Sequence, residues 1–425
     1  MRPPSSSHPR PVEPSLFIFA DLALYAFIAS LPFETIGGGG QSDQAFTLTI
    51  SRVLGIVWVV SCALRGQLHS PRCHRAFALS ALFVVVVAAR GVLVDSTFWP
   101  EVTSLVQTLI QMVVMLWLIT NAVRARPRLY ESIAWVYGVS CFVFSILIAS
   151  GLTATDFSQD KRITGLAEDP NTLAGKLSIG LVLVLGLLWS RKKTPLGIVL
   201  LLIATCPVVV FSILQTGSRG GLISLCFGLI VLALPRLLIH GSPLSRITAF
   251  ALTAALFSLM VYSIASSETV TTRWARTLNG GDMATREDLY PRVLALIAER
   301  PFFGWGPAAN YSVIGETMGV SRTQSTENSF FWMLTAVGIL GAIPLLYVVH
   351  VGLISAWRLR RTALGWTPVA CFITTMTFAS TIEWYLNKVF WLVLAVGIGA
   401  AWNATFIPAR VRVRPDAMAA IGRRP

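Results

Sequence analysis

The stretch FSILQTGSRGGLISL, residues 211–225, joins two apolar runs through a short polar turn, and Arg219 is its only formal charge. The apolar runs on either side suit membrane helices, which need about 20 residues each. A guanidinium at the edge of a membrane is costly and tends to be functional, although arginines also snorkel to lipid headgroups. The stretch therefore predicts two membrane helices and raises the question of what Arg219 binds.

The composition extends this prediction to the whole chain. Of the 425 residues, 54% are hydrophobic and only 13% are charged, whereas a soluble domain normally carries about twice that charged fraction. Because helices satisfy their backbone polar groups within one segment, they suit a lipid environment. We expect an all-α, polytopic helical membrane protein. Its net charge of +14 reflects loop charges, and we expect no nucleic-acid partner.

About twelve transmembrane helices are predicted, and basic residues orient them. The candidate spans are residues 16–32, 47–64, 76–94, 102–121, 131–151, 171–189, 196–214, 220–235, 247–266, 328–350, 365–383 and 389–406. Every second loop is rich in Arg and Lys, and such loops stay in the cytoplasm. Both termini are therefore expected to be cytoplasmic.

The chain organisation follows from these spans. We expect a disordered cytoplasmic tail (1–15), nine spans (16–266), a large outward loop (267–327), three spans (328–406) and a basic cytoplasmic tail (407–425). A structureless loop as long as 267–327 is uncommon. Within it, Leu289, Val293, Leu296 and Ile297 have helical spacing, which predicts an amphipathic helix that Pro301 ends.

The outward loops limit the chemistry that a site there can use. No two of the six cysteines have the spacing of a metal or redox pair, so we expect neither a metal nor another cofactor. No histidine falls in an outward loop; a proton acceptor there must be a carboxylate. The glycines around Arg219 allow a close backbone approach to a ligand, and an arginine beside a helix amino end suits a phosphate.

Several other polar residues are placed on the outward side. The predicted substrate-binding residues are Lys161, Arg162, Asn171, Lys176, Arg292, Asn328 and Lys388. Any one of them is most often a surface charge or a structural polar group. Several that converge on one pocket would form a diphosphate site.

Four stretches resemble the O-antigen ligase and Wzy-type polymerase superfamily of membrane glycosyltransferases. They are QTGSRGGLISL, GLAEDPNTLAGKLSIGL, TREDLYPRVLALIAERPFFGWGPAANY and STENSFFWMLTAVGILGAI, in this order between about residues 163 and 350. The resemblance implies glycan transfer from an undecaprenyl diphosphate carrier to an acceptor hydroxyl on the periplasmic face of a bacterial inner membrane. It also implies an inverting mechanism without metal or nucleotide sugar.

The resemblance assigns roles to three residues. Arg219 matches the arginine of the signature turn and Arg286 matches the loop arginine, and both would hold the diphosphate. The family's His-Asn element reads Glu327-Asn328 here, so the family's base histidine is absent. Either Glu327 replaces that histidine as general base, or it is a carboxylate at the amino end of a helix, favoured by the helix dipole. Glu383 is the rival carboxylate, and Asp169 is interpreted as a helix cap.

Three functions are compatible with the sequence. The first is a polymerase or ligase that transfers glycan to an acceptor glycan or to lipid A-core, with other polysaccharide assembly proteins as partners. The second is a flippase or transporter for lipid-linked oligosaccharides, but the two halves of the chain show no clear repeat of the kind that transporters carry. The third is a non-catalytic scaffold, which would tolerate substitution of Glu327.

Overall fold

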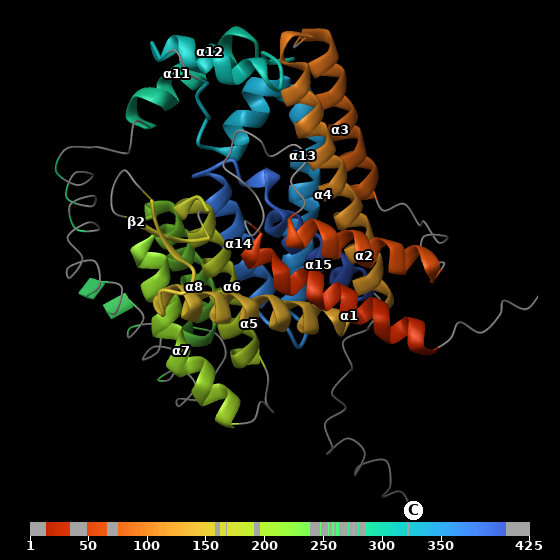
Figure 1. Ribbon diagram of the computed structural model, residues 1–425, viewed down its shortest axis with the longest axis vertical. Coiled ribbons are helices and arrows are strands. Elements are labelled where there is room, and N and C mark those ends of the chain that lie inside the picture. The colour runs from red at the N-terminus through yellow and green to blue at the C-terminus, as the bar shows by residue number, and fades with distance from the viewer. Residues whose placement is uncertain are drawn as a thin grey trace, which may run out of the picture.

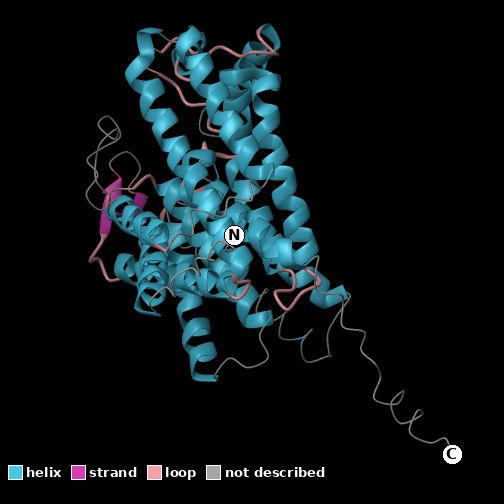
Figure 2. Cartoon of the chain, turned by 90° about the vertical axis from the view of Figure 1, so that its right-hand side faces the viewer, coloured by secondary structure: helices cyan, strands magenta, loops and turns pink. Residues whose placement is uncertain are grey.

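The structure is a computed structural model of the chain. It describes residues 14–34, 49–65, 75–94, 96–157, 162–166, 168–190, 196–238, 286–320 and 323–404, and isolated positions between 247 and 279. Within these ranges the chain is almost entirely helical (Figures 1 and 2). The predicted all-α class is confirmed for the described part of the chain.

The helices follow the chain in this order. A β-hairpin at residues 154–165 divides the series. Before this hairpin lie α1 (Pro14–Ser30), η1 (Leu31–Phe33), α2 (Ile50–Leu64), α3 (Arg75–Val94), η3 (Ser96–Phe98), α4 (Trp99–Ala125) and α5 (Leu129–Ala149). After it lie α6 (Pro170–Ser190), α7 (Leu196–Gln215), α8 (Arg219–Leu238), α11 (Arg286–Glu299), α12 (Ala309–Thr317), α13 (Ser329–Leu359), α14 (Thr367–Ala379), η4 (Trp384–Leu386) and α15 (Lys388–Ala404).

The helix lengths support a helical membrane protein without establishing twelve spans. Among the described residues, five helices are long and apolar enough to cross a membrane, namely α3, α4, α5, α6 and α13, and six further apolar helices are shorter. The predicted span 247–266 lies outside the described residues apart from isolated positions. The span predicted at 365–383 is only the 13 residues of α14, about 20 Å of helix, because the chain leaves the helix at Ser380 to form a polar turn.

Helix α6 is the centre of the bundle. Within its most apolar window 83% of the residues are buried, against 28% for α3, as expected for a helix that is hydrophobic on every side. It packs against α5, α7, α8 and α14. Glycines permit the close contacts: a Cβ on Gly175 would overlap the Phe378 ring of α14, and one on Gly221 of α8 would lie 2.5 Å from the Ala174 Cβ.

A two-stranded antiparallel hairpin precedes α6, where the sequence predicted only a short outward loop. Strand β1 (Ala154–Phe157) pairs with β2 (Arg162–Gly165), and Ala154 lies opposite Gly165. The strands pair the backbone polar groups of this segment, which would otherwise lack partners beside an apolar bundle. The hairpin fixes Arg162 near the amino end of α6.

Two helices between residues 286 and 317, α11 and α12, lie over one end of the bundle (Figure 1). As predicted, α11 buries Leu289, Val293 and Leu296, which pack with Ile314 of α12. The turn after α11, residues 301–306, is hydrogen-bonded to a break in α13, where Gly338 has φ +69°. There Trp305 N–H donates to the Thr335 carbonyl at 2.6 Å, and Ile339 N–H donates to the Pro301 carbonyl at 2.8 Å. Residues 301–306 and the break in α13 are therefore structural partners.

Candidate active site

A polar cavity of about 180 Å³ lies where the amino ends of α6, α8, α11 and α13 approach one another. Its lining residues are Arg162, Asn171, Ser218, Arg219, Gly220, Arg286, Glu327 and Thr381. All three residues predicted to be catalytic are among them. Helix amino ends and guanidinium groups both favour anions, so the cavity suits a phosphorylated ligand.

The turn between α7 and α8 places Arg219 at this cavity. Gly217 has φ +61° and its N–H donates to the Leu214 carbonyl at 2.8 Å, which ends α7 in the manner typical of glycine. Ser218 then caps α8, because its Oγ accepts from the Gly221 N–H at 3.2 Å. Arg219 is therefore the first residue of α8, half-buried against the cavity.

The glycines beside Arg219 serve helix packing. From the sequence, these glycines are expected to let the backbone approach a ligand closely. A Cβ on Gly220 would overlap the Thr381 side chain beyond the end of α14, and Gly221 lies against Ala174 of α6. Gly220 also lines the cavity. These small residues let the amino end of α8 enter between α6 and α14.

Arg286 and Glu327 form an ion pair at the wall of the cavity. Arg286 Nη2 lies 2.8 Å from Glu327 Oε2 and also donates to the Thr381 carbonyl at 2.8 Å. Glu327 has a left-handed backbone, with φ +52°, and the Tyr290 hydroxyl donates to its carbonyl at 3.4 Å. The first residue of α11 and the residue before Asn328, the cap of α13, thus meet at one wall of the cavity.

The hairpin and α6 supply another part of the cavity lining, through Arg162 of β2 and Asn171 of α6. Arg162 Nε donates to the Thr216 carbonyl at 2.6 Å, and its Nη2 donates to Asn171 Oδ1 at 3.0 Å. Asp169 accepts from the Thr172 N–H at 2.9 Å, so its predicted role as a cap is confirmed. These two hydrogen bonds fix the Arg162 guanidinium at the cavity wall.

A comparison with known protein families bears on this cavity. The O-antigen ligase family model matches residues 208–346, about a third of the chain. Residues 208–346 are thus similar to the O-antigen ligase family. No curated protein shows significant similarity to the chain. The ligase match confirms the resemblance to the ligase and polymerase superfamily, and it supports a role in glycan transfer during polysaccharide or O-antigen assembly.

The ligase segment supplies only part of the cavity. Ser218, Arg219, Gly220, Arg286 and Glu327 lie inside the matched residues, whereas Arg162, Asn171 and Thr381 lie outside them. Sequence reasoning missed Ser218 and Thr381 as lining residues. Ser218 stood in the quoted turn, but Thr381 lies at the end of an apolar run and carried no signal of its own.

Lys176 and Lys388 are not among the residues that line the cavity. Lys176 is fully buried, 2.5 Å from Glu168 Oε1 and 3.9 Å from Glu34 Oε2. Lys388 pairs with Glu34 and donates to the Ser51 hydroxyl at 2.9 Å. The prediction that both lysines belong to one site depended only on their assignment to the same side of the membrane. The structure instead gives them carboxylate partners within the protein. Burial raises the pKa of Glu168, which precedes the α6 span, to about 7.

The remaining predicted residues also have other contacts. Arg292 donates to the Thr317 carbonyl and so ties α11 to α12. Asn328 caps α13, since its Oδ1 accepts from the Phe330 N–H at 2.8 Å, and its amide donates to the Ser380 carbonyl at 2.8 Å. Neither side chain lines the cavity. Lys161 lies outside the described residues.

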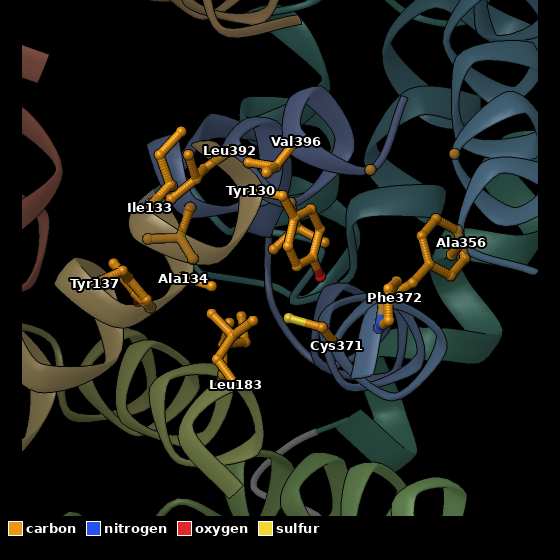
Figure 3. A pocket seen from close by; sticks show the side chains of 16 residues that line it. Tyr130, Ile133, Ala134, Tyr137, Leu183, Ala356, Cys371, Phe372, Leu392 and Val396 are labelled. Atoms are coloured by element: carbon orange, nitrogen blue, oxygen red, sulfur yellow. The ribbon is translucent and has the colours of Figure 1, made fainter. Parts of the chain in front are cut away.

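A second cavity lies among the helices of the bundle and is lined by different residues. It measures about 30 Å³ and is lined mostly by apolar side chains of α5, α6, α13, α14 and α15, including Ile133, Leu183 and Val396 (Figure 3). It shares no lining residue with the polar cavity. Within the described residues, no three His, Cys, Asp or Glu side chains are grouped to hold a metal.

Proposed function

We propose that the polar cavity binds the diphosphate of an undecaprenyl diphosphate-linked glycan and catalyses transfer of that glycan to an acceptor hydroxyl at the periplasmic face. One observation carries the proposal: Arg162, Arg219, Arg286 and Glu327 come from separate segments and line a single cavity. The ligase match to residues 208–346 supports the reaction class.

The charges of the lining fit a diphosphate. Among the described residues that line the cavity, three carry a guanidinium group and one carries a carboxylate, so cationic side chains outnumber anionic ones in this part of the lining. A diphosphate diester carries one negative charge on each phosphate, and a further charge develops on the leaving oxygen during transfer. Guanidinium groups already fixed around that oxygen stabilise this developing charge, which is the largest contribution that such a site makes to rate.

The proposed step is a single displacement. The acceptor hydroxyl gives its proton to the Glu327 carboxylate, and its oxygen forms a bond to the anomeric carbon. The bond from that carbon to the phosphate oxygen breaks, and its electron pair stays on the diphosphate. The anomeric centre is inverted, and no residue forms a covalent intermediate. The acceptor is either a carrier-linked repeat unit, as in a polymerase, or lipid A-core, as in a ligase.

The membrane orientation is part of the proposal. The cavity is bounded by the helix ends that the basic-loop pattern assigns to the outside: the amino ends of α6, α8 and α13 and the carboxyl end of α14. Basic loops mark the opposite ends of these helices. We place the protein in the inner membrane, with the cavity at the periplasmic rim and both termini in the cytoplasm.

The test uses the native host without its chromosomal copy of this gene. Arg219→Ala and Arg286→Ala should each abolish the surface glycan that the wild-type protein restores, while the protein level holds. Arg358→Ala, in the last turn of α13 and away from the cavity, serves as the control. Normal glycan from both cavity variants would refute the proposal. Purified protein that couples carrier-linked glycan to acceptor in detergent would exclude transport, because detergent leaves no two sides.

A further inference from the structure

Glu383 lies beyond the end of α14 and does not line the polar cavity, yet it is bonded to the segment that carries Glu327. Its Oε1 accepts from the Ser325 hydroxyl and the Thr326 N–H, both at 2.9 Å. The Thr326 hydroxyl lies 2.8 Å from the same oxygen. Its Oε2 accepts from the Tyr311 hydroxyl of α12 at 2.7 Å. One carboxylate thus joins the turn after α14, the helix α12 and the two residues before Glu327.

The bonded segment has a backbone that needs support. Glu327 has φ +52°, a left-handed conformation that costs a residue with a Cβ about 1–2 kcal/mol. Its N–H donates to Ser325 Oγ at 3.1 Å, and that hydroxyl is the one that donates to Glu383. Such conformations persist where the surroundings over-determine them. Glu383 supplies that constraint through Ser325 and Thr326.

The surroundings of Glu383 differ from those of Glu327. All of the hydrogen bonds that Glu383 accepts come from neutral donors, and the titratable groups that face it are the hydroxyls of Tyr311 and Tyr385. Burial raises the pKa of this carboxyl, against the hydrogen bonds from Tyr311, Thr326 and Ser325. Its oxygens are occupied by these donors, whereas Glu327 faces the cavity. The arrangement holds a backbone and offers no acceptor to a substrate.

We propose that Glu383 is a positioning residue that fixes the left-handed turn of Glu327, so that the Glu327 carboxylate points into the arginine-lined cavity. The inference rests on the proposed function, in which Glu327 accepts the acceptor proton. It also separates the two carboxylates that the sequence left as rivals: Glu327 touches the substrate, and Glu383 acts through it.

The first experiment compares Glu383→Gln with Glu383→Ala in the host that lacks the chromosomal gene. A glutamine oxygen can still accept from Ser325 and Thr326, and its amide can donate to the Tyr311 oxygen. Glu383→Gln should therefore keep most of the surface glycan. Glu383→Ala should lose about 100-fold, the size of effect expected when a catalytic group moves by about 1 Å. If both variants are equally inactive at wild-type protein level, Glu383 acts as a proton carrier and the proposal is wrong.

The second experiment asks whether Glu383 acts through Glu327. Ser325→Ala removes the hydroxyl between the two residues with little risk to the fold. It should lower glycan transfer in the wild-type background and cause no further loss in a Glu327→Gln background. An equal loss in both backgrounds would show an independent structural effect and overturn the proposal. The thermal midpoint of each purified variant is measured alongside.

The outcomes also separate this inference from the proposed function. If deletion of the gene leaves the surface glycan unchanged, or Glu327→Gln restores it fully, the proposed function fails. If deletion and Glu327→Gln abolish the glycan but Glu383→Ala does not, only the positioning role fails.

Discussion

Arg286 Nη2 lies 2.8 Å from Glu327 Oε2, and both side chains line the polar cavity. The pair is partly open to solvent, with side-chain exposures of 20% and 33%. A ligand diphosphate would seek the same guanidinium that Glu327 occupies. Anion binding and release of the Glu327 carboxylate are therefore coupled in the proposed mechanism.

This coupling predicts opposite effects of Glu327→Gln on binding and on transfer. Removal of the competing charge should tighten binding of inorganic pyrophosphate by about 2–5-fold, the value of a partly exposed ion pair. Transfer should fall by about 10²–10⁴-fold, the contribution of a general base. Calorimetric titration with pyrophosphate and the glycan assay measure the two effects.

The control for this prediction is Glu316→Gln, which removes an exposed carboxylate on α12 outside the cavity. It should change neither pyrophosphate affinity nor transfer. Weaker pyrophosphate binding by Glu327→Gln would show that Glu327 does not compete with the anion for Arg286.

The close packing of α8 predicts that Gly220→Ala impairs the site. The added Cβ would overlap the Thr381 side chain, so α8 must shift, and Arg219 with it. We expect glycan transfer to fall by at least about tenfold and the thermal midpoint to drop, as overpacking costs about 1–3 kcal/mol. Gly397→Ala in α15 is the matched control, because nothing lies within 4 Å of its Cβ position. Equal behaviour of the two variants would contradict the packing role of Gly220.

The sequence predicts the helical class, the amphipathic helix α11 and the cap at Asp169. It also singles out Arg286 and Glu327, which the structure brings into an ion pair. These features depend on local periodicity, on turn chemistry or on a family motif. Arg219 and Arg286 were named together because the motif joins them, and the cavity contains both.

The sequence could not predict the partners that residues find across the fold. Lys176 and Lys388 resemble Arg162 in the sequence, since all three are cations that the basic-loop pattern assigns to the outward side. Only the fold shows that Glu34 and Glu168 pair with the lysines, whereas Arg162 bonds to a carbonyl and an amide at the cavity. Likewise, Glu327 and Thr381 are 54 positions apart in the sequence, which hid their shared contact with Arg286.

The buried carboxylate of Glu168 predicts a pH dependence of stability. Burial raises its pKa from 4.5 to about 7, although Lys176 opposes the shift; Glu34 and Asp169 reinforce it. Because the folded pKa lies above the unfolded one, this contribution to stability is complete below about pH 4.5 and is lost as the pH rises through about 7. The thermal midpoint of Glu168→Gln should therefore fall less between pH 5 and pH 8 than that of the wild type. Parallel curves would refute the shift.

The junction between the turn after α11 and the break in α13 predicts a specific requirement for glycine at position 338. Gly338 has φ +69°, and a Cβ there would overlap the Phe302 backbone. Gly319 also has φ +69°, but nothing lies within 4 Å of its Cβ position. Gly319→Ala should therefore cost only the left-handed strain of about 1–2 kcal/mol. Gly338→Ala should cost more and also release the loop from α13. Limited proteolysis after Phe302 or Phe303 and the thermal midpoint measure both effects; equal losses in the two variants would show that strain alone, without the docked loop, explains the glycine.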